Sequence, residues 1–180
     1  KEILNLNQSI SWMTEDTLGF LWIVTIMGRL VRYNMAQATA TEFVASPKDP
    51  ASWSGKPVNW LSVDSKGRLW FATSDGLERL DPPANGFTQI TEKDGLLSNN
   101  VRGVAEDDHG FLWVSTTKGI SRFDPETGRF KHYDASYGLE PAADVLMGGV
   151  VKASNGEMLF GGATGVTVFH PDSIRDNRFI

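Results

Sequence analysis

Three groups of residues have the types that metal binding, cofactor binding or acid–base catalysis requires. Residues 107–109 read Asp-Asp-His, and carboxylates beside an imidazole suit a metal ion. Residues 161–165 read Gly-Gly-Ala-Thr-Gly, a composition that suits a phosphate-binding loop. His132 and His170 have side chains that can carry a proton in catalysis. Each group has to be judged against the sequence around it.

The surrounding sequence favours a structural role for all three groups. Residues 107–109 are in register with Asp-Thr-Leu at 16–18 and Asp-Ser-Lys at 64–66, which predicts a hairpin turn. No helix is predicted after 161–165, and no Ser or Cys nucleophile can be assigned to either histidine. The sequence predicts no catalytic residue, no metal ligand and no cofactor. Whether carboxylates of different repeats pair with one another stays open.

A second group of residues suits ligand binding. Trp53 and Trp60 have aromatic faces that could stack on a sugar ring, and the polar members of the group could hydrogen-bond to its hydroxyls. The alternative, a solvated rim without a ligand, stays open. The candidate ligand-binding residues are Trp53, Asn59, Trp60, Asp75, Asn99, Arg102 and Lys118.

The elements that would position these residues form a repeat. A strand of the type Gly-x-Leu-Trp recurs with its tryptophan at Trp22, Trp70 and Trp113, and a weaker copy has Leu159 there. The spacings of 48, 43 and 46 residues are typical of propeller blades or helical arrays. Successive side chains of a strand point to opposite faces, and in each copy both faces are largely apolar, which indicates a strand covered on both sides. The three tryptophans are therefore predicted to pack between blades rather than to stack on a ligand.

Each repeat predicts four antiparallel strands, the unit of a β-propeller blade. An Asp-x-x-Gly turn joins the first two strands, and a second glycine precedes the third. We predict an all-β fold, a β-propeller of four repeated four-stranded antiparallel blades that is part of a larger ring. The blades span about 6–46, 56–91, 99–134 and 144–180 of a single segment, 1–180.

Three further expectations follow from the repeat. The segment 29–34 carries one residue more than its counterparts, which we interpret as a bulge. Arg32, Arg79 and Arg122 recur in the third strands and are expected to pair with carboxylates or backbone carbonyls. The open first and last blades should expose apolar faces that favour self-association.

Function is expected where the repeat is least regular. The turns between second and third strands, at 26–27, 74–75, 117–118 and 163–164, should share one face with the joins 46–57, 91–100 and 134–144. The starts of the inner strands add Ser11, Asn59, Trp60 and Arg102 to this face. All seven candidate ligand-binding residues lie in these turns, joins and strand starts.

Composition excludes several classes of partner. The net charge is −5 and no run of Lys or Arg is present, which argues against nucleic acid. No apolar run is long enough to cross a bilayer, and the first residues lack a signal-peptide pattern. The chain has no cysteine, so it forms no disulfide, but this says little about its compartment.

The pattern Glu-Asp-x-x-Gly-x-Leu-Trp-x-x-Thr-x-x-Gly-[Leu/Ile]-x-Arg-[Phe/Leu]-Asp resembles the two-component regulator propeller repeat. Residues 106–124 and 64–81 match nearly throughout, 15–34 match more loosely, and 138–171 look like the last blade of such a propeller. The resemblance implies an extracytoplasmic sensor of a hybrid histidine kinase, in the periplasm or outside a bacterial cell. It implies an oligosaccharide ligand, further propeller blades and downstream signalling domains as partners, and kinase activity outside this segment. A propeller enzyme of the polysaccharide lyase or hydrolase type and a protein-binding scaffold are the alternatives.

Overall fold

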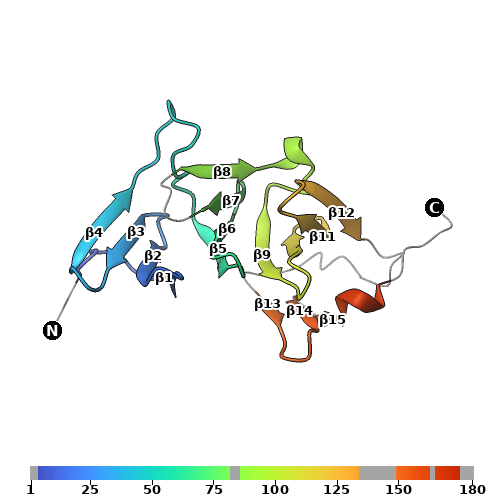
Figure 1. The fold of residues 1–180 in the computed structure, drawn as a ribbon. Coiled ribbons are helices and arrows are strands. Elements are labelled where there is room, and N and C mark those ends of the chain that lie inside the picture. Colours follow the sequence, from blue (N-terminus) through green and yellow to red (C-terminus); the bar gives the residue numbers. More distant parts are fainter. Residues whose placement is uncertain (1–3, 82–85, 134–148, 163–164, 175–180) are drawn as a thin grey trace.

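The computed structural model describes residues 4–81, 86–133, 149–162 and 165–174. Their strands form four antiparallel sheets, here called blades 1 to 4, each with strands in sequence order (Figure 1). Blade 1 contains β1 (Ile10–Glu15), β2 (Phe20–Thr25), β3 (Leu30–Asn34) and β4 (Thr39–Phe43). Blade 2 contains β5 (Val58–Val63), β6 (Leu69–Thr73), β7 (Gly76–Leu80) and β8 (Phe87–Ile90). Blade 3 contains β9 (Val101–Glu106), β10 (Leu112–Thr116), β11 (Gly119–Asp124) and β12 (Arg129–Tyr133). Blade 4 contains β13 (Val150–Lys152), β14 (Met158–Gly161) and β15 (Val166–Phe169).

This architecture confirms the predicted propeller. The outer strand that we expect near the end of blade 4 falls at 178–180, outside the described residues. Two short 3₁₀ helices, η1 (Glu92–Asp94) and η3 (Pro171–Ser173), complete the described elements. None of the helices in these ranges has the length and apolar character needed to cross a membrane.

The blades pack face to face through three apolar clusters, one at each junction between successive blades. Trp22, Trp70 and Trp113 each lie in one of these clusters with no exposed surface. Every residue of β6 and of β10 is buried, as expected for strands covered on both faces. The tryptophans of the repeat are therefore core residues, as predicted.

A hydrogen bond between an aspartate and the tryptophan six residues later recurs in blades 1 to 3. The indole Nε1 of Trp22 donates to Asp16 Oδ2 at 2.7 Å, and the pairs Trp70–Asp64 and Trp113–Asp107 do so at 2.8 Å. The other carboxylate oxygen of each aspartate accepts from two backbone N–H groups of the hairpin turn. One buried carboxylate thus joins the turn to the core of the blade.

Blade 4 lacks both members of this pair. Ala153 stands in the place of the aspartate and Leu159 in the place of the tryptophan. The turn itself persists, because Gly156 N still donates to Ala153 O at 3.0 Å, with Gly156 at φ +84°. Both residues of the pair are thus absent together, as expected for a carboxylate and an indole that each need the other when buried.

The repeated arginines lie over aromatic rings, a contact that the sequence did not predict. Arg79 is 5.7 Å from the centroid of Trp70, and Arg122 is 4.5 Å from that of Phe111. Arg32 lies over three rings of blade 1, among them Trp22. The expected carboxylate partner is found for Arg79, whose Nη2 lies 3.1 Å from Asp81 Oδ2.

The extra residue of blade 1 is not a bulge, contrary to our expectation. β2 and β3 pair without interruption from Phe20–Asn34 to Val24–Leu30. The added residue, Arg29, lies instead in the turn, where its carbonyl accepts from Thr25 N at 3.0 Å. A turn at the surface accommodates one more residue without disturbing the ladder.

The four sheets do not close into a ring. Contacts link β1 with β5, β5 with β9 and β9 with β13, but the described strands of blades 1 and 4 do not pack extensively on each other. Leu6 covers part of the outer face of blade 1. The outer face of blade 4 carries exposed valines: Val151 (55%), Val166 (61%) and Val168 (49%). This face contains Leu159, so it corresponds to the tryptophan faces that are buried in the other blades.

The Asp–Trp bond yields a stability prediction. Asp107→Ala would leave the buried Trp113 indole N–H and two turn N–H groups without an acceptor, each at a cost of about 1–3 kcal/mol. We expect a loss of about 3 kcal/mol or more in the free energy of unfolding, measured in urea. The exposed neighbour Asp108 provides the control, since Asp108→Ala should change stability little. Equal effects of the two substitutions would contradict this account.

The exposed valine face yields a prediction on association. We expect the chain to self-associate through blade 4, and Val168→Lys to lower the mass-average molar mass in a light-scattering dilution series. Val44→Lys is the matched control, because Val44 is equally apolar and 69% exposed but lies in the connection after β4. A monomer at all concentrations, or the same response to both substitutions, would refute the prediction.

Candidate ligand-binding site

A β-bulge occurs at the same position of the innermost strand in blades 1, 2 and 3. Ile10 and Trp12 pair with the consecutive residues Thr25 and Val24, so Ser11 is the extra residue. The same irregularity makes Asn59 the extra residue of β5 and Arg102 that of β9. Bulges redirect side chains and are frequent beside functional sites. The sequence located these three residues at the strand starts but gave no sign of the bulges.

The bulged residues carry three different polar groups. Ser11 Oγ donates to Val24 O at 3.0 Å, within its own blade. Asn59 Nδ2 donates to Val101 O of the next blade at 2.7 Å. Arg102 Nε is buried and has no hydrogen-bond partner within the described residues. A hydroxyl, an amide and a guanidinium therefore occupy equivalent places in consecutive blades, and the last of these has a donor to spare.

Two tryptophans lie beside the bulged residues. Trp12 and Trp60 meet edge to face with ring centroids 4.9 Å apart, and Trp12 Nε1 donates to Val58 O at 3.0 Å. Each is half-buried and lines one of two hollows. The hollow at Trp12 has a volume of about 320 Å³ and includes Ser11 and Asn59. The hollow at Trp60, between the inner strands of blades 2 to 4, has a volume of about 340 Å³.

The remaining polar candidates lie at the rim. Asn99 Oδ1 accepts from Glu92 N at 2.7 Å, and Lys118 Nζ lies 3.2 Å from Glu92 Oε1. The hydrogen bond from Lys118 lowers the pKa of the Glu92 carboxyl. Asp75 is exposed and lies 3.6 Å from Lys56 Nζ. The structure thus places Asn59 and Trp60 together and Asn99 beside Lys118, with Asp75 apart from both groups.

Trp53 cannot serve as a stacking platform, contrary to our expectation. Its ring is only 1% exposed and packs on Phe71 and Phe87, with centroids 5.0 and 5.4 Å away. Its Nε1 donates to Gly28 O at 2.7 Å. The residue lies in a connection, where exposure is the usual expectation, but it anchors that connection in the core between blades 1 and 2.

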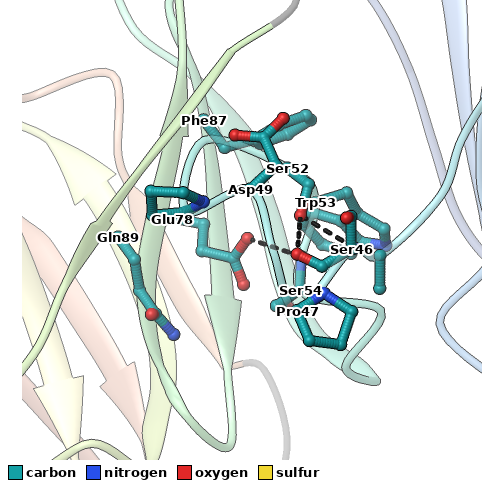
Figure 2. A pocket seen from close by; sticks show the side chains of 11 residues that line it. Ser46, Pro47, Asp49, Ser52, Trp53, Ser54, Glu78, Phe87 and Gln89 are labelled. Carbon is teal, nitrogen blue, oxygen red and sulfur yellow. Dashed lines mark hydrogen bonds between the residues drawn. The ribbon is translucent and has the colours of Figure 1, made fainter.

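A pocket of about 300 Å³ lies between this connection and the outer strands of blade 2 (Figure 2). Figure 2 shows Glu78 and Gln89 of the sheet facing the segment that carries Ser46, Ser52 and Ser54. Glu78 is 1% exposed, and its Oε2 accepts from Ser54 N at 3.2 Å. Its Oε1 is buried and has no hydrogen-bond partner within the described part of the chain. Burial raises the pKa of the Glu78 carboxyl. Nothing in the repeat pattern pointed to this residue.

The side chains of 107–109 diverge. Asp107 bonds Trp113, Asp108 lies 2.6 Å from Lys152 Nζ, and His109 Nε2 lies 2.8 Å from Asp172 Oδ1. The hydrogen bond to Asp172 raises the pKa of His109. Gly110 N donates to Asp107 O at 3.2 Å, which confirms the predicted hairpin turn. Within the described ranges, no three His, Asp or Glu side chains are grouped as a metal ion would require.

His132 has a serine partner that the sequence did not reveal. Ser121 Oγ lies 2.8 Å from His132 Nδ1, across the pair β11–β12. Ser121 has no exposed surface, and its hydroxyl is already paired with the His132 ring. Burial lowers the pKa of His132. The pair satisfies a buried hydroxyl, and only the strand register brings the two residues together.

Comparison with known proteins supports the repeat family. Residues 52–75 and 95–118 match the family model described as two component regulator propeller. No curated protein matches the chain. The extracellular domain of the putative hybrid two component system BT3049 from B. thetaiotaomicron is 26% identical, with a TM-score of 0.77 over 94% of this chain. The corresponding domain of BT4673 from the same organism is 20% identical, with a TM-score of 0.74 over 92% of this chain.

Propellers of other kinds share the fold. A gluconolactonase, XC5397 from Xanthomonas campestris, is 20% identical, with a TM-score of 0.64 over 94% of this chain and 61% of its own. The present chain spans 23% of each of the two hybrid-system domains. The match of the repeats, the antiparallel blades and their packing lead to one conclusion. Residues 52–75 and 95–118 of this β-propeller segment are two-component regulator propeller repeats.

Proposed function

We propose that the chain is part of an extracellular sensor propeller of a bacterial two-component signalling protein and that it binds a carbohydrate. The family match and the likeness to the extracellular domain of a hybrid two component system support the first part. The kinase and the membrane anchor would belong to other parts of such a protein. The partners would be further propeller blades and the signalling domains that respond to them.

One observation carries the carbohydrate part of the proposal: two of the bulged residues, Ser11 and Asn59, lie next to the Trp12–Trp60 pair, and Arg102 holds the equivalent place in the next blade. An aromatic face suits the apolar side of a sugar ring. The amide of Asn59 and the guanidinium of Arg102 suit its hydroxyls, and Arg102 Nε lacks a partner in the described structure. The inner strands are held by the packed blades, so these groups are positioned before the ligand arrives.

The role that we propose is binding rather than catalysis. The gluconolactonase shares the propeller fold with this chain, and fold alone carries no activity. In a sensor, the free energy of ligand binding shifts the relative position of blades or domains, and a rigid inner edge passes such a shift on. Contacts from one blade to the next, such as Asn59 Nδ2 to Val101 O, are suited to this task.

The proposal predicts the effect of two substitutions on glycan binding. A panel of neutral and uronate-containing oligosaccharides is screened, and the affinity of each bound glycan is measured by calorimetry. Asn59→Ala and Arg102→Ala should each weaken binding about tenfold or more, because each removes a hydrogen-bond donor from a half-buried site. Asn155→Ala is the control, since Asn155 is an exposed amide in the hairpin turn of blade 4.

Thermal unfolding of each variant distinguishes lost contacts from lost structure. Unchanged glycan affinity in both folded variants would place the ligand elsewhere. Binding of none of the glycans in the panel would remove the carbohydrate part of the proposal.

A further inference from the structure

The pocket beside Glu78 is a built feature of the connection between blades 1 and 2. The connection is held by its own bonds: Asp49 N donates to Ser46 O, and Ser52 N donates to Asp49 O, both at 3.0 Å. It is tied to blade 2 because Phe87 N donates to Ala51 O at 2.8 Å. Trp53 anchors it in the core. A compact loop of this kind, packed by its own side chains, often carries a function.

Glu78 departs from the repeat. The strand register aligns it with Val31 in blade 1, Ser121 in blade 3 and Thr167 in blade 4, because each pairs with the residue that follows the tryptophan or its replacement. Those three positions hold an apolar group or a hydroxyl. Only blade 2 has a carboxyl group there, and the fold does not require it. A buried carboxylate with an unpartnered oxygen is costly, and the cost is relieved either by a proton or by a partner that donates to that oxygen.

The charge of the pocket points to the nature of that partner. Two carboxylates, those of Glu78 and Asp49, belong to its lining, and among the described residues no Lys, Arg or His does. The nearby Lys56 lies outside the lining and pairs with Asp75 at 3.6 Å. The lining also contains hydroxyls of Ser46, Ser52 and Ser54, which can position a polar ligand.

We infer that this pocket binds a small organic molecule that carries a protonated primary amine, with Glu78 Oε1 as the acceptor of the ammonium group. An ammonium group has three donors and a positive charge, so it satisfies the oxygen that now lacks a partner. The site is separate from the inner-strand site with Trp12 and Trp60, and it does not depend on the proposed binding of a carbohydrate there.

Binding should be linked to the ionisation of Glu78. Burial is the main cause that raises the pKa of this carboxyl; Asp75 raises it further, and the hydrogen bonds from Ser54 and the charge of Lys56 oppose the rise. An ammonium ligand prefers the ionised carboxylate and so lowers this pKa again. The free protein binds more protons than the complex between the two pKa values. Affinity for the amine should therefore rise with pH in this range.

The experiment uses two amines and a neutral analogue as probes of the 180-residue chain. D-Glucosamine and N-acetyl-D-glucosamine differ in whether the nitrogen carries a charge, and ethanolamine presents an ammonium group without a sugar. Calorimetry at about pH 6.5, where amines of this type are mainly protonated, should show binding of an amine but not of N-acetyl-D-glucosamine. Binding of both amines would indicate a general ammonium site, whereas binding of D-glucosamine alone would indicate an amino-sugar site.

Two variants locate the binding. Glu78→Gln keeps the shape of the side chain and should weaken amine binding about tenfold or more. Gln89→Ala is the control, since Gln89 lines the same pocket without a charge, and it should alter affinity far less. If Glu78→Gln fails to fold, the pH dependence of amine binding in the unmodified chain decides instead. Equal affinity for N-acetyl-D-glucosamine, no binding of either amine, or pH-independent binding would overturn the inference.

Discussion

The fold depends on the burial of an aspartate carboxylate between a hairpin turn and a tryptophan ring. In blades 1 to 3 this group accepts the indole N–H with one oxygen and two turn N–H groups with the other. A buried indole needs an acceptor, and a buried carboxylate needs donors, so neither residue is stable in its place alone. Blade 4 illustrates the same constraint, because it has Ala153 in place of the aspartate and Leu159 in place of the tryptophan.

A scaffold held in this way leaves other positions free to differ between blades. The bulges of β1, β5 and β9 hold Ser11, Asn59 and Arg102, three different polar residues at one structural position. The connection before β5 folds over blade 2 and encloses Glu78 in a pocket that the repeat does not otherwise contain. Both features add a particular chemistry to a frame whose stability lies in the apolar junctions and the Asp–Trp bonds.

The candidate sites were predictable only in part. Asn59, Trp60 and Arg102 could be located because the repeat identifies the start of each inner strand. The role predicted for Trp53 was wrong, since the sequence of a connection does not show whether its tryptophan faces solvent or enters the core between two blades. The pairing of Ser121 with His132 and the burial of Glu78 with one unpartnered oxygen could not be predicted either, because both depend on which strands lie side by side and what covers them.

The sequence by itself determined the blade repeat, the strands, the Asp-x-x-Gly turns and the buried tryptophans. These features are local: alternation sets the faces of a strand, and turn residues set its ends. Only the tertiary structure decided which side chains converge, through the bulges, the packing of the connection on β7 and β8, and the uncovered face of blade 4. These depend on contacts between residues far apart in the chain, and neither periodicity nor turn chemistry encodes such contacts.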